Sequence, residues 1–379
     1  MKRLSIVALI LLVAMLITPG CAKKEKESEE TTKKVETTEV VEDTTEDTED
    51  EQKEDKVDPS KYNPLTGLKT KKKLLNKRPV SIMVNNIYSS LPQEGVGQAD
   101  ILYECLAEGG IPRLLMIVAD YEKLTKVGSV RSARDYYIDY AEGYDCIFIH
   151  AGGSTYAYNT FGERGTERLD GVQGPTISEL FYRDPERLGK YISEHTLVVN
   201  NGEKIKEAID YYEYRTKTDK AHKNPMKFVA EGKKTTLDNK AKHIRVLMSG
   251  AQTVDYVYSK KDGKYLRYQY NGERHMDNTT GKQLSFTNVI LIFTEHALIS
   301  GDEKNRISVQ TTGTGEGWYI TNGTYQKITW EKEEHSSVTK YFYEDGKEVK
   351  LNRGKTMINV VPVENAEHVV FDDVWEDNK

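Results

Sequence analysis

Residues that could carry acid–base, anion-binding or nucleophilic chemistry gather in four short segments between residues 95 and 184. The first segment holds two carboxylates four residues apart, Glu104 and Glu108, with Arg113 shortly after them. Two carboxyl groups at one site could act as a general acid and a general base. The other three segments carry the remaining candidate ligand- or partner-binding residues, which are Arg131, Ser132, Arg134, His150, Ser154, Asp170 and Asp184.

The chemistry expected of these segments is anion binding or acyl transfer. Arg131 and Arg134 are predicted to begin a helix, where fixed cations and free N–H groups together could hold a carboxylate or phosphate. The run from His150 to Ser154 superficially resembles a nucleophile beside oxyanion amides, although it lacks the G-x-S-x-G elbow. The glycine pairs at 109–110 and 152–153 would let backbone amides approach a ligand closely.

A purely structural role accounts for the same residues equally well. His150 at a strand end could be an ordinary buried histidine, and glycine pairs are common in turns. Arg131 and Arg134 could fix a helix to a sheet by pairing with acidic neighbours, namely Glu104, Glu108, Asp135 or Asp139. Both interpretations stay open from the sequence.

Residues 61–230 show the alternating pattern of an α/β fold. Helices are predicted at 130–144 and 203–214, with a weaker one at 177–181. Strands are predicted at 80–84, 101–106, 114–119, 146–150 and 196–200. Several candidate residues stand where these strands end, the position at which α/β sheets usually gather ligand contacts.

Residues 231–379 predict a second, mostly-β domain. Short β-prone stretches alternate there with turn signals, which is typical of hairpins. The signals are Asp262-Gly263, Asn271-Gly272, Thr280-Gly281, Asn322-Gly323 and Asp345-Gly346. A glycine run at 313–317 is interpreted as a further turn, because no strand–loop–helix frame for phosphate binding surrounds it.

The N-terminus predicts an exported, lipid-anchored protein. Lys2 and Arg3 precede an apolar run at 4–17, which has the length of a signal-peptide core and is short for a membrane span. Pro19 and Gly20 end this run, and Cys21 follows in a lipobox-like position. We expect residues 1–20 to be a signal peptide and Cys21 to be acylated, with an ordinary secretory signal or an uncleaved anchor helix as the alternatives.

Residues 21–60 are expected to form a disordered acidic tether. Positions 22–60 hold 16 Asp and Glu against 7 Lys and no aromatic residue. A flexible segment of this length spans roughly 35 Å. Outside this segment the chain is close to neutral, which argues against nucleic-acid binding. We therefore expect a domain held on the extracytoplasmic face of the cell membrane.

Cys105 and Cys146 are the cysteines that remain beyond the anchor. They could form one disulfide if their strands are neighbours, or they could be two buried thiols. No spacing of Cys and His indicates a zinc site, and we expect no metal and no cofactor.

The segments, taken in order, resemble the YerB-like family of bacterial lipoproteins. The resemblance runs from about residue 63 to residue 362. It rests on Asn63-Pro64-Leu65-Thr66-Gly67, Arg78-Pro79-Val80, Ala99-Asp100-Ile101, Glu108-Gly109-Gly110, Val127-Gly128, Val130-Arg131-Ser132-Ala133-Arg134, His150-Ala151-Gly152-Gly153-Ser154, Tyr265-Leu266-Arg267, Asn288-Val289-Ile290 and Gly354-Lys355-Thr356.

The resemblance implies a layered α/β part followed by a smaller mostly-β part, and it implies no particular activity. The chain departs from the family pattern at three positions. Pro112 stands where the pattern has Thr, Ser129 replaces a Pro, and Thr196 follows His195 where the pattern has Asn.

Three classes of function follow from these features. The leading one is a binding or regulatory lipoprotein of the cell envelope, facing the wall or an envelope protein partner. The second is a hydrolase or transferase acting on peptidoglycan or a related polymer, with Glu104 or Glu108 as acid or base. The third is a solute-binding protein, which would normally show two matched α/β lobes that this sequence lacks.

Overall fold

The computed structural model describes residues 62–70, 74–173, 179–223, 225–372 and 375. The predicted signal peptide, Cys21 and the tether lie outside these residues. No helix among the described residues is long and apolar enough to cross a membrane.

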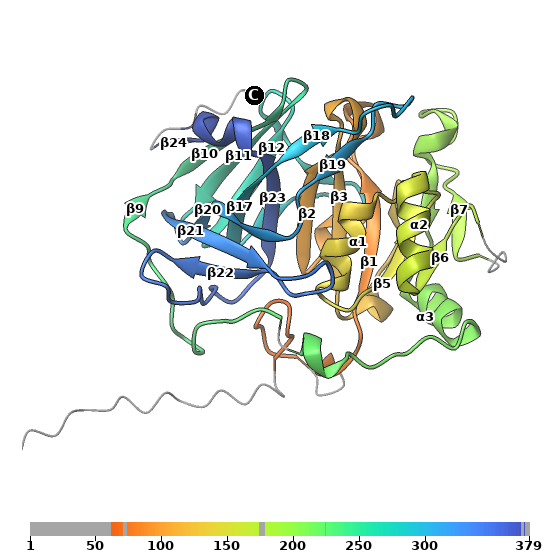
Figure 1. Cartoon of the computed structure of the whole chain (residues 1–379), viewed down its shortest axis with the longest axis horizontal. Helices are drawn as coiled ribbons and strands as arrows, with labels where there is room; N and C mark the ends of the chain where they lie inside the picture. Colours follow the sequence, from red (N-terminus) through yellow and green to blue (C-terminus); the bar gives the residue numbers. More distant parts are fainter. Residues whose placement is uncertain (1–61, 71–73, 174–178, 224, 373–374, 376–379) are drawn as a thin grey trace, which may run out of the picture. The chain divides into compact units, whose positions relative to one another are not determined.

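An 11-stranded mixed sheet is the centre of the described part of the chain (Figure 1). Its order is β22 (Lys340–Tyr343), β21 (Thr324–Lys332), β20 (Gly313–Thr321), β17 (Asn288–Thr294), β23 (Thr356–Pro362), β2 (Ile101–Leu106), β3 (Pro112–Val118), β1 (Val80–Asn85), β5 (Ile147–His150) and β6 (Arg168–Asp170), with β9 (Asn239–Lys240) beside β21.

A second, 6-stranded sheet faces the central one within the described residues. Its order is β13 (Glu273–Arg274), β12 (Lys264–Gln269), β11 (Gln252–Ser259), β10 (His243–Ser249) and β24 (Val370–Asp372), with β16 (Ser285–Phe286) beside β12. Two smaller sheets have two strands each, β14 (Met276–Asp277) with β15 (Lys282–Gln283) and β18 (His296–Leu298) with β19 (Ile307–Val309). A third small sheet has the order β4 (Val127–Gly128), β8 (Leu197–Val199) and β7 (Phe181–Arg183).

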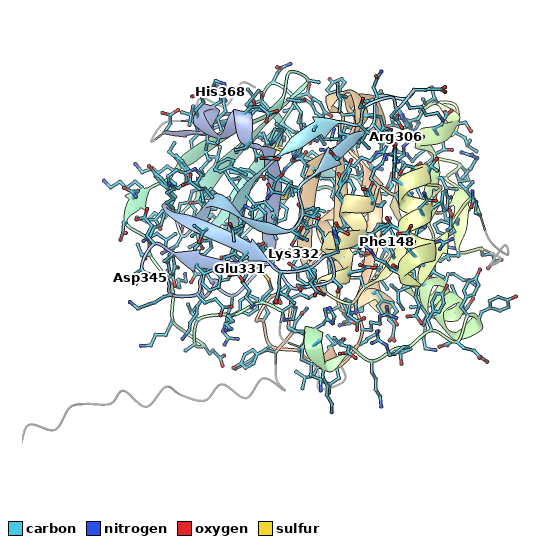
Figure 2. All side chains as sticks on the ribbon, viewed as in Figure 1. Phe148, Arg306, Glu331, Lys332, Asp345 and His368 are labelled. Atoms are coloured by element: carbon cyan, nitrogen blue, oxygen red, sulfur yellow. The ribbon has the colours of Figure 1, made fainter. Side chains whose placement is uncertain are left out.

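Helices cover the other face of the central sheet. α1 (Asp135–Glu142) and α2 (Thr155–Arg164) lie across it in Figure 1. α3 (Gly202–Tyr211) packs on the face that also carries the second sheet, where Ile205, Ala208 and Ile209 join the shared core. Phe148 of β5 is labelled in Figure 2. Its ring lies 5.5 Å from that of Phe161 of α2, measured between centroids. Single 3-10 turns fill the connections, namely η3 (Tyr88–Ser90), η4 (Val96–Gln98), η5 (Glu108–Gly110), η6 (Tyr121–Lys123), η7 (Ser193–His195), η8 (Lys220–His222) and η9 (Val363–His368).

Strand β2 shows how the two cores divide. Its side chains alternate between the faces of the sheet, as in any strand. Leu102 and Leu106 join the core shared with the second sheet, whereas Tyr103 and Cys105 join the core under the helices. Glu104 therefore faces the second sheet, between two leucines.

The fold is mixed α/β with sheet predominating, which confirms the predicted class in part. Strands predicted at 80–84, 101–106, 114–119 and 146–150 are confirmed as β1, β2, β3 and β5. All five turn signals of the second half join neighbouring antiparallel segments. Strands from both sides of residue 230 pair in the central sheet, as in β2 with β23; the domain division at that residue stays a prediction.

Two sequence interpretations were wrong. The helix predicted at 130–144 begins only at Asp135, because residues 131 and 133 pair their amides with Met83 and Gly152 carbonyls in extended backbone. The glycine run at 313–317 opens strand β20 instead of forming a turn. A side chain at Gly317 would come within 2.3 Å of the Leu291 carbonyl oxygen, so close strand packing requires glycine there.

The remaining elements differ in smaller ways. The predicted helix at 203–214 is α3, and its Asn201 cap accepts a hydrogen bond from the Lys204 amide. The strand predicted at 196–200 is β8 of a small sheet. Of the weak helix at 177–181, residues 177–178 lie outside the described residues and Phe181 begins β7.

Candidate functional site

One edge of the central sheet collects most of the predicted site residues. Four strands of this sheet run in the same direction. β1 and β2 are both antiparallel to β3, and β5 and β6 follow β1 in parallel pairs. The carboxyl ends of these strands therefore meet at this edge. Asn85, Leu106, His150 and Asp170 are the last residues of these strands. The expectation that candidates gather at strand ends is met here, but they divide between the two faces of the sheet.

Glu108, Arg113 and Arg134 form an ion-pair cluster on the helix side of the edge. The Arg134 guanidinium binds both carboxylate oxygens of Glu108, with Nε donating over 2.9 Å, and Arg113 Nη2 lies 3.3 Å from Oε1. Arg113 also donates to the Ser132 carbonyl over 2.8 Å. Burial opposes ionisation of Glu108, but the hydrogen bonds of Arg134 and the charge of Arg113 lower its pKa to about 2. Glu108 is therefore a poor proton donor at neutral pH.

Arg131 and Ser132 border this cluster without joining its ion pair. The Arg131 Nη1 donates to the Glu194 carbonyl over 3.3 Å, and its buried Nε has no hydrogen-bond partner among the described residues. Burial lowers the pKa of Arg131, as does the nearby Arg134 charge. Ser132 takes part through its backbone carbonyl, which accepts from Arg113. Arg131 and Arg134 bind different partners, the Glu194 carbonyl and the Glu108 carboxylate, so they do not bind one anion together.

His150, Ser154 and Asp170 hold the loop that leads into α2. His150 is fully buried and stacks on Phe161, and its Nδ1 lies 2.7 Å from the Gly152 carbonyl oxygen. Asp170 accepts from the Gly152 amide over 2.9 Å. Ser154 caps α2 by accepting from the Ala157 amide over 3.0 Å. Its hydroxyl serves the helix, and its interpretation as a nucleophile has no support from this geometry.

Asp184 lies in a separate cluster. Its carboxylate accepts from Lys126 Nζ over 2.8 Å, and Lys126 also faces the buried Glu94 at 3.8 Å. Arg187 contacts Glu94 at 3.4 Å. These groups fasten the segment that contains β7 to the loop after β1.

Glu104 lies on the opposite face of the sheet, fully buried between the two sheets. Arg267 of β12, also fully buried, donates to its Oε2 over 2.6 Å, and Asn359 donates to the same oxygen over 2.8 Å. Its Oε1 accepts from Asn86 over 2.7 Å and from Gln252 over 3.3 Å. Both carboxylate oxygens are occupied, so Glu104 has no lone pair directed at a substrate.

The network closes through a ring of hydrogen bonds. Arg267 donates to His275 Nδ1, so His275 carries its proton on Nε2 and donates to Gln93 Oε1 over 2.8 Å. The Gln93 amide donates to Asn86 over 2.7 Å, and Asn86 completes the ring at Glu104. Burial and then the charge of Arg267 hold the pKa of His275 well below its usual value. The ring thus requires neutral His275.

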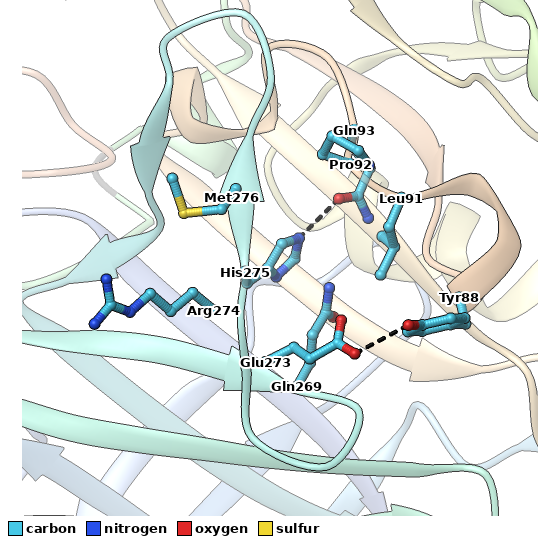
Figure 3. Close-up of a pocket in the computed structure, with 9 residues that line it drawn as sticks. All are labelled: Tyr88, Leu91, Pro92, Gln93, Gln269, Glu273, Arg274, His275 and Met276. Carbon is cyan, nitrogen blue, oxygen red and sulfur yellow. Dashed lines mark hydrogen bonds between the residues drawn. The ribbon is translucent and has the colours of Figure 1, made fainter. Parts of the chain in front are cut away.

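A cavity of about 320 Å³ opens beside this ring. Its lining comes from η3 and the segment after it, and from β12, β13 and β14 (Figure 3). His275 and Gln93 form its back wall, and the hydroxyl of Tyr88 donates to Glu273 over 2.9 Å across from them (Figure 3). The other lining residues are Leu91, Pro92, Gln269, Arg274 and Met276. Tyr88 is 55% exposed, which leaves much of its ring available.

The sequence interpretation missed this pocket and most of the ring. The partners of Glu104 lie up to 255 positions away in the chain, and local sequence patterns do not predict contacts over such distances. One signal was present in the sequence. Arg267 ends a segment that carries the family resemblance, and it is a charged residue between Leu266 and Tyr268.

The described residues contain no group of three or more His, Cys, Asp or Glu side chains placed to hold a metal ion. Cys105 and Cys146 are both free and buried, and burial raises the pKa of each thiol. His195, which precedes the Thr196 departure, is buried, and its Nδ1 has no hydrogen-bond partner in the part of the chain that the structure describes. Burial lowers the pKa of His195.

Comparison with known proteins gives consistent matches over the described part of the chain. Residues 65–215 match the N-terminal domain, and residues 244–358 the C-terminal domain, of a family described as protein of unknown function (DUF3048). The protein named "Putative lipoprotein YerB" from Bacillus subtilis (strain 168) is 32% identical over 302 residues, which are 79% of this chain and 86% of that protein. The crystal structure of YerB from Bacillus subtilis superposes with a TM-score of 0.69 at 29% identity, covering 82% of this chain and 99% of that one.

Proposed function

The chain belongs to the YerB-like DUF3048 family, and from this premise we propose that it is a lipid-anchored binding protein of the cell envelope. The observation that carries the proposal is the 320 Å³ pocket beside the closed ring of His275, Gln93 and Glu104. The pocket offers recognition groups, whereas the carboxylates suited to acid–base work are held in ion pairs. Binding without turnover is therefore the function that this geometry supports best.

The chemistry of the pocket suits a neutral, polar ligand such as a sugar residue of a wall glycan. An exposed aromatic ring can pack on the apolar face of a sugar, and carboxylate and amide groups can bind its hydroxyls. Tyr88, Glu273 and Gln269 supply these groups, and Leu91 and Met276 add apolar wall. The volume lies at the lower end of the range for small-molecule sites.

The anchor is proposed on separate grounds. Cys21 follows a signal-peptide pattern, and the Bacillus subtilis relative carries the word lipoprotein in its name. Fatty-acid labelling of cells expressing the chain is expected to mark it, and Cys21→Ser is expected to abolish the label. Persistence of the label in the variant would show that another residue is acylated.

The binding proposal is tested with soluble peptidoglycan fragments and the full chain in a non-ionic detergent. We expect saturable binding that weakens about tenfold in Tyr88→Ala, because an aromatic contact of this kind contributes about 1–1.5 kcal/mol. Tyr211→Ala on α3 removes another exposed tyrosine ring (67% against 55% for Tyr88) outside the pocket and is the matched control. Mass spectrometry of the fragments is expected to find no new products.

Two results would overturn this proposal. Products that appear with time would make the chain an envelope hydrolase or transferase. Binding that is equal in Tyr88→Ala and the unaltered chain would remove the pocket from recognition.

A further inference from the structure

The opposite edge of the central sheet carries two neighbouring hollows lined by cations. One, of about 280 Å³, is lined by Lys264, Lys282 and Lys355 together with Thr280 and Ser285. The other, of about 210 Å³, is lined by Lys233, Lys234 and Arg353 together with asparagine and threonine side chains. Neither lining includes an aspartate or a glutamate.

The two hollows adjoin because consecutive parts of the chain line them. Gly263 and Thr287 line the smaller one, and the residues beside them in the chain, Lys264 and Phe286, line the larger. Thr287 and Lys355 directly precede β17 and β23, which are parallel neighbours. The hollows therefore lie at the amino ends of these strands.

The cations of the larger hollow lack acidic partners. No carboxylate among the described residues lies within ion-pair distance of Lys264, Lys282 or Lys355. Lys355 is partly buried and donates to the Gly97 carbonyl. Burial lowers its pKa, Lys264 lowers it further, and Asp100 and Asp277 oppose that effect.

The two nearby carboxylates are committed to backbone amides. Asp277 accepts from the Gly97 amide over 2.7 Å and the Gly95 amide over 3.0 Å. Asp100 accepts from the Ala119 amide over 2.8 Å. Three lysines line the larger hollow and two carboxylates lie near it, so a net positive charge remains.

We propose that the larger hollow binds a phosphate ester group, held by Lys264, Lys282 and Lys355 with the hydroxyls of Thr280 and Ser285. Lysine binds phosphate as a point charge, and hydroxyl groups can donate to the remaining oxygens. The adjacent hollow, with Lys233, Lys234 and Arg353, would take a second negative group of the same ligand. Such a group could come from a phosphodiester polymer or from a phospholipid headgroup.

The test measures the thermal unfolding midpoint of the full chain in non-ionic detergent as phosphate replaces chloride at constant ionic strength. A ligand that binds only the folded state raises the midpoint, and the rise grows with the ratio of its free concentration to its Kd. We expect inorganic phosphate and glycerol 3-phosphate to raise it, and acetate to have little effect. Phosphorus NMR line broadening gives the affinity directly.

Variants of exposed lysines test the assignment without disturbing the interior. Lys264→Ser/Lys282→Ser is expected to bind phosphate about tenfold more weakly, since two charge-assisted contacts are lost. Lys190→Ser/Lys304→Ser removes the same charge from exposed positions outside both hollows and is the control. Equal binding by the first variant and the unaltered chain, or equal protection by acetate, would overturn the proposal.

The source of the phosphate is distinguished in two further arms. Tighter binding of poly(glycerol phosphate) than of the monomer would identify a polymer that also uses Lys233 and Lys234. Tighter binding to micelles containing phosphatidylglycerol than to micelles containing phosphatidylcholine would identify a lipid headgroup. In either case we expect the tighter binding to disappear in Lys264→Ser/Lys282→Ser. Tighter binding that persists in this variant would contradict the proposed site.

Discussion

Glu104 and Glu108 lie four positions apart, yet they occupy contrasting environments. Glu104 is fully buried between two sheets, and its neighbours come from residues 86, 252, 267 and 359. Glu108 is 29% exposed at the sheet edge, and its partners Arg113 and Arg134 lie within 26 positions of it. Glu104 therefore connects distant parts of the chain, whereas Glu108 connects the residue before α1 to the nearby strand β3.

The difference follows from strand geometry. Glu104 belongs to β2, where alternation turns its side chain toward the second sheet. Glu108 lies beyond the strand in η5, where the left-handed backbone of Gly109 (φ +70°) turns the chain toward β3. Glu104 needs a charged partner inside the protein, because a carboxylate in the core between the two sheets cannot reach water.

Replacing Glu104 or Glu108 by glutamine should lower the free energy of unfolding by different amounts. Glu104→Gln leaves the buried Arg267 without its counter-charge, and breaking a buried ion pair typically costs about 3–5 kcal/mol. We expect a loss of this size in the free energy of unfolding, measured by urea titration of the full chain. Glu303→Gln changes an exposed glutamate and is the control. A loss below about 1 kcal/mol would mean that Arg267 finds water in the folded protein.

Glu108→Gln should cost less, about 2 kcal/mol, because the site is partly exposed and Arg113 keeps the Ser132 carbonyl as a partner. The contribution also depends on pH. With a folded pKa of about 2, below the ordinary 4.5, it is fully present above pH 4.5 and is lost as the pH falls toward 2. The acid limb of the stability curve should therefore be shallower in the variant. A loss of unfolding free energy equal to that of Glu104→Gln would contradict the proposed difference between the two environments.

The sequence predicted the local part of this arrangement better than the distant part. Strands β1, β2, β3 and β5 and the hairpin turns follow from apolar runs and Asn-Gly or Asp-Gly signals within a few residues. The pairing of Glu108 with Arg134 was one of the alternatives considered, because both lie close in the chain.

The partners of Glu104 could not be predicted in the same way. Arg267 reaches it only because β12 of the second sheet packs over β2, a contact between elements far apart in the sequence. α2 was also missed, since only Ala157 and Phe161 are buried on it and Gly162 weakens its helical pattern.

Neutral His275 gives the buried region a pH dependence at higher pH than that of Glu108 at the sheet edge. Its folded pKa lies below its ordinary 6.5, so the unfolded chain binds the proton first as the pH falls. Stability from this group is fully present above pH 6.5 and declines below it, by about 1.5 kcal/mol between pH 6.5 and 5. His275→Gln should remove that part of the decline, as seen in unfolding titrations at several pH values.

The exposed His368 provides the comparison for this measurement, because His368→Gln also replaces one imidazole by an amide. Its stability curve should keep the slope of the unaltered chain. If His275→Gln keeps that slope as well, the ring around Glu104 tolerates a charged His275, and its hydrogen bonds must rearrange.

The smallest expected effect concerns Ser154, for which capping and catalysis make different predictions. Ser154→Ala removes the acceptor for the Ala157 amide and should cost about 1 kcal/mol of unfolding free energy. Ser154→Asp keeps an acceptor and places a negative charge at the start of α2, so it should restore the loss. A nucleophile would behave otherwise, because aspartate could not replace its hydroxyl in acyl transfer. Recovery of stability in Ser154→Asp, with fragment binding unchanged in both variants, would place Ser154 among the residues that hold the edge of the sheet and leave recognition to the opposite face.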